Sequence, residues 1–336
     1  MMGRGNTVTR TALWFGLAFA VAVVAAGFST RLQLTNIAHV IETERRILAG
    51  EDISDGHVIL TTLYNRVLFP FIFVNAKRLL PSFDPGHLFL ALRFASFLLC
   101  FALMFHSIDR RASRAGADPA GTCLAIGMAF VSSLISHPLP YASDIFDLAL
   151  MFYVFLNLLE GRTGIAFALA CLTAANRESG AFAGVVYFMI RAGNVPPARL
   201  LATSALLAVV PYALAVGLRR FVYQGTLPAT DPGQFLTGLP VNLSTMWIDV
   251  TRFNPGNNFY LLVAMTVLAA MPFARRIMPP DLRTRIVLAT LAIALITLLF
   301  GLVREIRIFL PCVALLAAAA VAETGPDRRE RGLSSA

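Results

Sequence analysis

Long apolar runs alternate with short polar segments along most of this 336-residue chain. Eight of the runs reach or approach the ~20 residues that a helix needs to cross a ~30 Å hydrocarbon core. Because lipid offers no hydrogen-bond partner to an exposed backbone group, such runs predict transmembrane helices. They cover residues 12–29, 87–108, 119–137, 144–160, 199–218, 259–274, 285–302 and 305–322.

One further apolar stretch, residues 163–191, is interrupted at its centre by Asn176-Arg177-Glu178-Ser179-Gly180. Its 29 residues are too many for one comfortable span and too few for two. Ionisable residues within a membrane segment are costly and usually face a cavity, so the stretch predicts two half-length helices that meet within the membrane. With this hairpin, residues 1–336 form a single all-α, polytopic transmembrane bundle of about ten segments, with both termini on the same side.

The arginines orient this bundle. Those of the loops 109–118, 191–199 and 275–285, and those of both tails, fall on one face. The positive-inside rule assigns that face to the cytoplasm, so we expect a multi-pass protein of the plasma (inner) membrane with both termini cytoplasmic. Residues 30–86 and 219–258 are then extracytoplasmic loops, and the last segment, 323–336, is a cytoplasmic tail.

The composition supports this class and excludes others. Hydrophobic residues make up 57% of the chain and charged residues 14%, whereas soluble domains carry about 25% charged residues. The net charge of +9 comes from 28 basic and 19 acidic residues, and loop arginines account for most of it, so we expect no nucleic-acid partner. The four cysteines lie in apolar runs without CxxC spacing, which predicts neither a disulfide framework nor a zinc site.

The first outer loop carries amphipathic segments and one distinctive carboxylate. Residues 67–74 are apolar but too short to span, so we expect them on the membrane surface or half-inserted. In residues 36–50, Glu44 projects into the middle of an apolar stripe. If the stripe packs on the bundle, this carboxylate enters a low dielectric and can serve as a general base; alternatively it pairs with an arginine to fix the helix. The stripe consists of Ile37, Val40, Ile41, Ile47 and Leu48.

Two groups of charged residues lie at membrane depth, where orientation by loop charge does not explain them. The first is Arg177 with Glu178 at the hairpin tip, and it either faces a cavity or forms a self-satisfied pair that holds the half-helices together. The second, between the last two runs, contains Arg304, Glu305 and Arg307. In the ten-segment arrangement both groups lie near the outer interface.

Arg66 and Arg93 are expected at about the same depth, near the outer interface. A guanidinium matches a phosphate with bidentate hydrogen bonds, so arginines that converge on one level indicate an anionic headgroup. For Arg66 and Arg93, ordinary interfacial anchoring by snorkelling is an equal alternative.

Asp144 begins the run 144–160 and Asp147 follows one turn later. Helix capping is the simpler interpretation of Asp144 because a carboxylate complements the N-terminal dipole. The alternative is that the two aspartates bind a cation or a sugar hydroxyl, so an assisting divalent metal stays possible, although no other cofactor is expected.

The layout resembles the GT-C superfamily of membrane glycosyltransferases, which use polyprenyl-phosphate-linked sugars. The likeness lies in a first span, a long acidic outer loop, a multispanning bundle and the short motifs AANRESG (174–180) and REIRIF (304–309). It implies inverting sugar transfer to an extracytoplasmic glycan, lipid or protein acceptor. Glu44 would be the base, Arg177 and Arg304 would bind the phosphate, and Arg66 and Arg307 are weaker phosphate candidates; Glu178, Glu305 and Asp144 complete the expected binding site.

Two other classes compete with this interpretation. Broken helices with a charged pair at mid-membrane are also typical of transporters, so the protein could transport or flip a lipid-linked anionic substrate. A non-catalytic assembly subunit would instead use the arginines to bind lipid without turnover.

Overall fold

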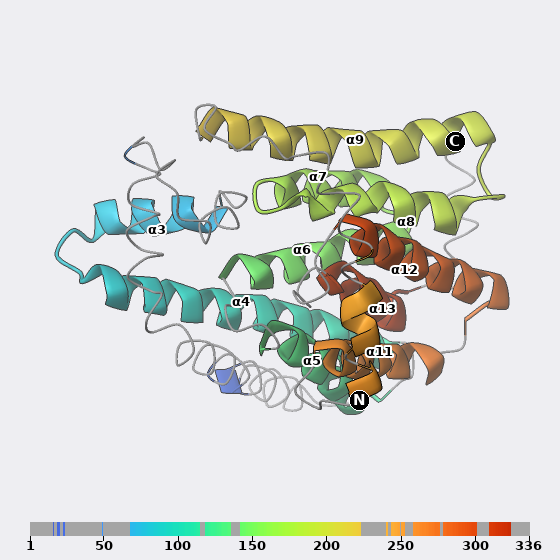
Figure 1. Ribbon diagram of the computed structural model, residues 1–336, viewed down its shortest axis with the longest axis horizontal. Helices are drawn as coiled ribbons and strands as arrows, with labels where there is room; N and C mark the ends of the chain where they lie inside the picture. The colour runs from blue at the N-terminus through green and yellow to red at the C-terminus, as the bar shows by residue number, and fades with distance from the viewer. Residues whose placement is uncertain are drawn as a thin grey trace, which may run out of the picture.

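The computed structural model describes residues 68–114, 118–135, 142–222, 243–248, 250–252, 258–275, 278–300 and 309–323, with a few single residues besides. Within these ranges the chain is helical and has no strand (Figure 1), which confirms the predicted all-α class. The first apolar run, 12–29, lies outside the described residues except at single positions.

The helices follow the apolar runs. They are α3 (Leu68–Leu79), α4 (Pro85–Arg114), α5 (Pro119–Ile135), α6 (Ala142–Leu159), α7 (Thr163–Ala174), α8 (Phe182–Arg191), α9 (Pro197–Val222), α11 (Asn258–Arg275), α12 (Pro280–Phe300) and α13 (Leu310–Val321). Among the described residues, three helical segments are long and apolar enough to cross a membrane, Pro85–Arg114, Pro197–Leu218 and Pro280–Leu299. This finding supports a membrane protein.

The core forms around α6 and α13. Every residue of α13 from Leu310 to Val321 is buried, and this helix packs against α6, α11 and α12. Its alanines allow the neighbouring backbones to approach closely, as small residues do between membrane helices. Large aromatic side chains fill the space between α4, α5 and α6; they are Phe97, Phe101, Phe105, Phe130, Phe152 and Phe155.

The interrupted stretch is a hairpin of two short helices, as predicted. The helix α7 has 12 residues and α8 has 10, and a 3-10 turn, Glu178–Ala181, lies between them. Both ends of α8 are placed against α6, because Ser179 bonds to Asp147 and Arg191 Nη2 donates to Leu158 O at 3.5 Å. Since α8 therefore runs parallel to α6, α7 returns antiparallel to both.

Helix ends that carry arginines gather at one end of the bundle. The end of α4 reaches the end of α6 because Arg111 Nε lies 2.9 Å from Glu160 Oε1. Arg285, near the start of α12, donates to Ile190 O at the end of α8 at 3.3 Å, and Arg114 meets Glu323 beyond α13 at 2.9 Å. The charge pattern predicted that these ends share a face, and the described residues confirm it.

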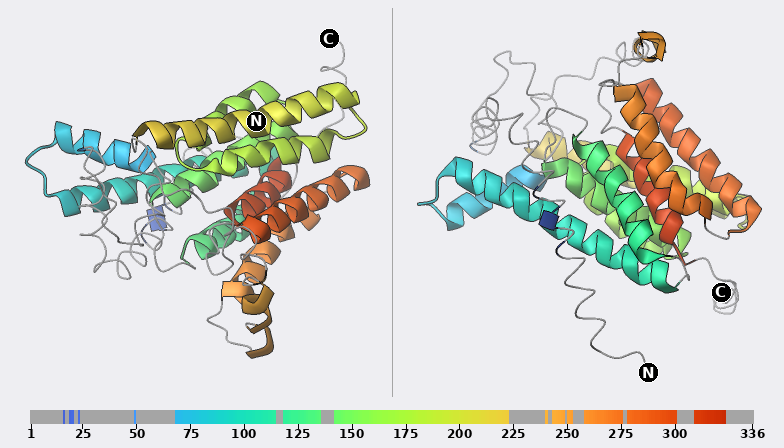
Figure 2. Two further views of the ribbon diagram at one scale, coloured as in Figure 1. Left: turned by 45° about the horizontal axis from the view of Figure 1, so that its top comes forward. Right: turned by 90° about the horizontal axis from the view of Figure 1, so that it is seen from below.

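The helix α3 and the start of α4 project from the opposite end (Figures 1 and 2). Phe69 and Phe73 of α3 pack on Phe89, with ring centroids 5.4 and 5.8 Å away. At its start α3 reaches the hairpin, because Leu68 N donates to Ala175 O at 3.0 Å. The described residues of the apolar segment 67–74, from Leu68 on, therefore belong to a helix that packs on α4, and its position at the membrane surface stays a prediction. Between the helices, Asp84 accepts a 2.9 Å bond from His87 N, and this bond lowers the pKa of the Asp84 carboxyl.

The packing of α8 on α9 leads to a first prediction. A Cβ added at Gly184 would lie 2.4 Å from Ser204 O and 2.7 Å from the Ala208 Cβ, whereas one at Gly217 meets nothing within 4 Å. We expect Gly184→Ala to lower the free energy of unfolding by about 1–3 kcal/mol, the usual cost of overpacking. Thermal unfolding of the purified protein in detergent measures this loss. Gly217→Ala, also on a helix, is the matched control and should keep the midpoint or raise it slightly, because Ala has the higher helix propensity. Equal midpoints for both variants would contradict the observed packing.

Candidate functional site

A buried polar centre lies where the hairpin turn meets the start of α6, at the end of the bundle away from the clustered arginine ends. We call it the hairpin centre and define it as Arg93, Asp144, Asp147, Arg177 and Ser179. Its members come from α4, α6 and the segment between α7 and α8. Segments far apart in the sequence thus bring their ionisable groups to one place inside an apolar protein.

The two aspartates share the guanidinium of Arg177. Its Nη1 lies 3.7 Å from Asp144 Oδ1 and 4.0 Å from Asp147 Oδ2. Both carboxylates are buried, whereas 17% of the Arg177 side chain is exposed. Asp144 also lies in the first turn of α6, where it complements the helix dipole. Asp144 thus combines a place in the first turn of α6 with an ion pair to Arg177, and the alternative that the two aspartates bind a cation or a sugar hydroxyl stays a prediction.

The local backbone explains why the side chain of Arg177 reaches α6 instead of continuing the helix α7. At the end of α7, the N–H groups of Asn176 and Arg177 both donate to Thr173 O, at 2.8 and 2.7 Å. Arg177 then adopts an extended backbone, φ −158° and ψ 161°, which stops the helix. Ser179 follows in the 3-10 turn and donates a short hydrogen bond from Oγ to Asp147 Oδ1. This bond and the ion pairs fasten the turn to α6.

Arg93 is a further member of the centre. Only 1% of the residue is exposed, its guanidinium carbon lies 5.9 Å from the centroid of the Phe97 ring, and the charge of Asp144 acts on it. A side chain buried this completely does not snorkel to lipid headgroups, so the anchoring alternative for Arg93 is wrong. The centre therefore balances the charges of its two arginines against those of its two aspartates, which is how proteins tolerate buried ions.

The other predicted site residues fall into two groups. Glu178 is exposed at the start of the 3-10 turn. The ion pairs described for Arg177 are with Asp144 and Asp147 of α6, so the hairpin is fastened to α6 through this arginine, and the predicted pairing of Arg177 with Glu178 stays a prediction. The remaining site residues lie outside the described part of the chain; they are Glu44, Arg66, Arg304, Glu305 and Arg307.

Sequence reasoning noticed Asp147 and Arg93 without assigning them to the site. The signal for Asp147 was its spacing of three residues from Asp144, which places both carboxylates on one helix face. For Arg93 the signal was an arginine inside an apolar helix, where an ionisable residue generally faces the protein interior.

The chemistry available here is that of an arginine held by two carboxylates at ion-pair distances of 3.7 and 4.0 Å. An anion that binds Arg177 competes with Asp144 and Asp147, and its arrival releases carboxylate oxygens that can accept hydrogen bonds from hydroxyl groups. In the part of the chain that the structure describes, no three His, Cys, Asp or Glu side chains are grouped to hold a metal ion. The chain matches no protein-family model, no curated protein and no solved structure.

The charge balance of the hairpin centre can be tested by a double-mutant cycle. Arg177→Met leaves one arginine with two buried aspartates, and breaking a buried ion pair in this way costs about 3–5 kcal/mol. Arg177→Met with Asp147→Asn restores one positive to one negative charge, while the amide oxygen can still accept the Ser179 bond. We expect the double variant to be more stable than Arg177→Met alone. Unfolding midpoints in detergent are measured for the parent, the two single variants and the double variant. Strictly additive losses of stability would show that Arg177 and Asp147 do not interact.

Proposed function

We propose that the protein is a membrane glycosyltransferase that moves a sugar from a polyprenyl-phosphate donor to an extracytoplasmic acceptor. The observation that carries this proposal is Arg177, held at the tip of a broken helix by two buried carboxylates at one end of an apolar bundle. A bidentate guanidinium suits the donor phosphate, and a site among membrane helices suits a lipid-linked substrate.

The proposed reaction is a single displacement. The donor phosphate binds Arg177, with Arg93 behind it, and the displaced aspartates together with Glu178 and Glu305 accept hydrogen bonds from sugar hydroxyls. Glu44 takes the proton of the acceptor hydroxyl, whose oxygen attacks the anomeric carbon. The bond from that carbon to the phosphate oxygen breaks with inversion, and polyprenyl phosphate leaves with the electron pair. Arginines stabilise the charge that develops on the phosphate, with Arg304, Arg66 and Arg307 as further donors of hydrogen bonds.

The finer topology belongs to the same proposal. We place the clustered arginine ends in the cytoplasm, both termini on that side, and ten segments in the plasma membrane. On α4, Arg93 precedes Asp109 by 16 residues, a rise of about 24 Å at 1.5 Å per residue. A hydrocarbon core is about 30 Å thick, so this orientation puts the hairpin centre just below the outer interface, where a lipid-linked phosphate resides.

The decisive test of function incubates the purified protein, in sealed vesicles, with a labelled polyprenyl-phosphate sugar and membrane extract as the source of acceptor. Removing one preorganised donor from a developing oxyanion costs about 100- to 1,000-fold in rate, so we expect a loss of this size in Arg177→Gln. Arg177→Lys keeps the charge but not the fork, and should retain an intermediate rate. Arg199→Gln, an exposed arginine at the other end, is the control. Full transfer by a folded Arg177→Gln protein would refute the proposed phosphate site.

Glu44 is tested separately. Glu44→Gln removes the base while preserving size, so with normal expression we expect loss of the glycan product. Unchanged transfer would eliminate Glu44 as the base and leave the aspartates of the hairpin centre as candidates.

The same vesicle assay separates the second candidate function. The half-helices α7 and α8 favour a transporter or flippase, because broken helices that meet at a charged turn form substrate sites in such proteins. A flippase would carry the labelled lipid across the bilayer without forming a glycan. A non-catalytic assembly subunit would do neither.

The sidedness is tested by cysteine labelling in intact cells with a membrane-impermeant maleimide. Ser113 at the end of α4 and Phe83 before its start are both exposed. We expect the Phe83→Cys variant to label from outside and the Ser113→Cys variant to label only after the membrane is opened. The parent protein provides the background, because three of its four cysteines are buried. Reversed labelling would invert the topology and move the proposed site to the cytoplasm.

A further inference from the structure

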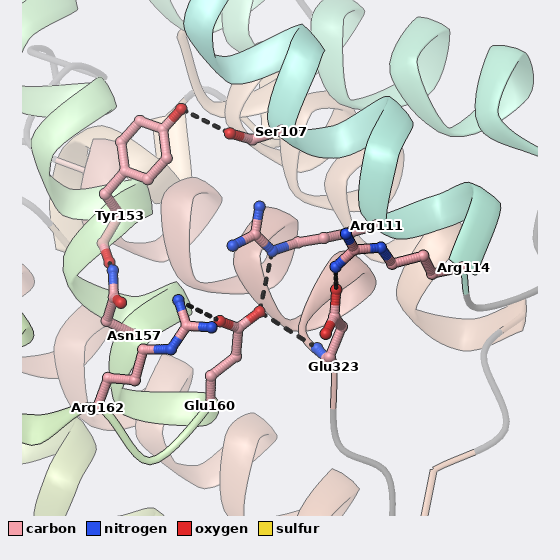
Figure 3. A network of polar contacts seen from close by, with 8 residues as sticks. All are labelled: Ser107, Arg111, Arg114, Tyr153, Asn157, Glu160, Arg162 and Glu323. Atoms are coloured by element: carbon pink, nitrogen blue, oxygen red, sulfur yellow. Dashed lines mark hydrogen bonds and ion pairs between the residues drawn. The ribbon is translucent and has the colours of Figure 1, made fainter.

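A second polar cluster joins α4, α6 and the segment after α13 at the other end of the bundle (Figure 3). Its centre is Glu160, whose Oε1 lies 2.9 Å from Arg111 Nε and whose Oε2 lies 3.4 Å from Arg162 Nη1. Glu323 extends the cluster, because its backbone N donates to Glu160 Oε1 at 3.5 Å and its carboxylate meets Arg114 Nη1 at 2.9 Å. We call Arg111, Arg114 and Arg162 the arginine cluster.

The charges in this region are separated by depth. The Glu160 side chain is 0% exposed, whereas 53% of the Arg114 side chain and 40% of the Arg162 side chain are exposed. Glu160 holds Arg111 and Arg162 from within, and the guanidinium groups of Arg114 and Arg162 form the outer layer. The side chains of Arg111 and Glu323 lie between these levels, with 17% and 27% exposed. The surface that reaches solvent or lipid headgroups is therefore positive, although the cluster as a whole contains two glutamates.

The arginines keep most of their donors for another group. In the part of the chain that the structure describes, the ion pairs of these arginines use a single nitrogen each, Nε of Arg111 and Nη1 of Arg114 and Arg162. A guanidinium has five N–H donors in a planar fork. Figure 3 shows Arg111 joined to Glu160 through Nε, with neither of its terminal nitrogens in a contact with the residues drawn. That fork is the part of arginine that matches phosphate oxygens.

The surroundings of the cluster fit a lipid. Two exposed leucines, Leu99 and Leu103, precede Arg111 on α4. On α7, Ile165 is exposed just after Arg162. The helix α7 begins at Thr163, so the positive end of its dipole adds to the charge of Arg162. A Cβ built at Gly164, in this first turn, meets nothing within 4 Å, so the turn is open.

We infer that the arginine cluster is a binding site for the phosphate of an anionic phospholipid, with the acyl chains against the exposed leucines of α4. This site is distinct from the hairpin centre and does not depend on the proposed reaction. It differs from general attraction of loop arginines to the membrane, because the glutamates fix the geometry of these three side chains. Arg199 and Arg275 are exposed at the same end, which makes them suitable for comparison.

The experiment measures how much phosphatidylglycerol stabilises the full-length protein in mixed micelles, relative to phosphatidylcholine. The test variant is Arg114→Gln with Arg162→Gln, which spares Arg111 and therefore the partner nearest to buried Glu160. The control, Arg199→Gln with Arg275→Gln, removes the same net charge from the same end. Since only the difference between the two lipids is compared, a change in basal stability does not affect the result.

We expect phosphatidylglycerol to raise the Tm of the parent and the control by similar amounts, and the test variant to lose at least half of that rise. In native mass spectrometry, the parent and the control should retain similar numbers of phosphatidylglycerol molecules, and the test variant should retain fewer. An equal rise in both double variants would overturn the site. Inorganic phosphate alone should produce no rise, and a rise equal to that of phosphatidylglycerol would overturn the assignment to a lipid.

Discussion

A charge buried in an apolar bundle needs a partner of opposite sign, and this constraint fixes the register of α4 against α6. Arg93 and Arg111 lie 18 residues apart on α4, which is five helical turns at 3.6 residues per turn, so both project from the same face. Asp144 and Glu160 lie 16 residues apart along α6 and its end. Arg111 pairs with Glu160, and Arg93 lies within the field of Asp144. A slip of one turn would leave ions at both ends without these partners.

The rest of the bundle is arranged around the helix that is held in this way. Between its charged ends α6 is apolar and almost completely buried, and it contacts α4, α7, α8 and α13. Tyr153 and Asn157 are polar residues of this stretch, and Tyr153 donates to Leu103 O at 2.9 Å, which joins α6 to α4 once more. The hairpin is fastened to the same helix at both levels, by Ser179 and Arg177 near its start and by Arg191 near its end. The two polar clusters thus share one scaffold.

The sequence predicted what depends on local pattern. Apolar length predicted the helices, the interruption at Asn176-Arg177 predicted the hairpin, and the arginine loops predicted the shared end. It did not predict the partners of Arg177, because the adjacent Glu178 competes with Asp144 and Asp147, which are some 30 residues earlier in the chain. Only the packing of α6 on the hairpin brings the two aspartates to Arg177. Glu160 was missed for a related reason. It ends an apolar run and resembles an ordinary helix terminus, and only the packing of the bundle brings Arg111 of α4 and the segment after α13 into contact with it.

The geometry around Arg177 bears on the proposal that this buried centre binds a phosphate. The ion pairs described with Asp144 and Asp147, at 3.7 and 4.0 Å, run through one nitrogen to two different carboxylates, whereas a phosphate can engage two nitrogens of the same guanidinium in parallel. The two aspartates balance the charge of the arginine within a low dielectric. Under the proposed function, an entering phosphate would replace these two contacts with short bidentate hydrogen bonds. The displaced carboxylates would then face the substrate, so the groups that hold Arg177 would become acceptors for the hydroxyl groups of the substrate.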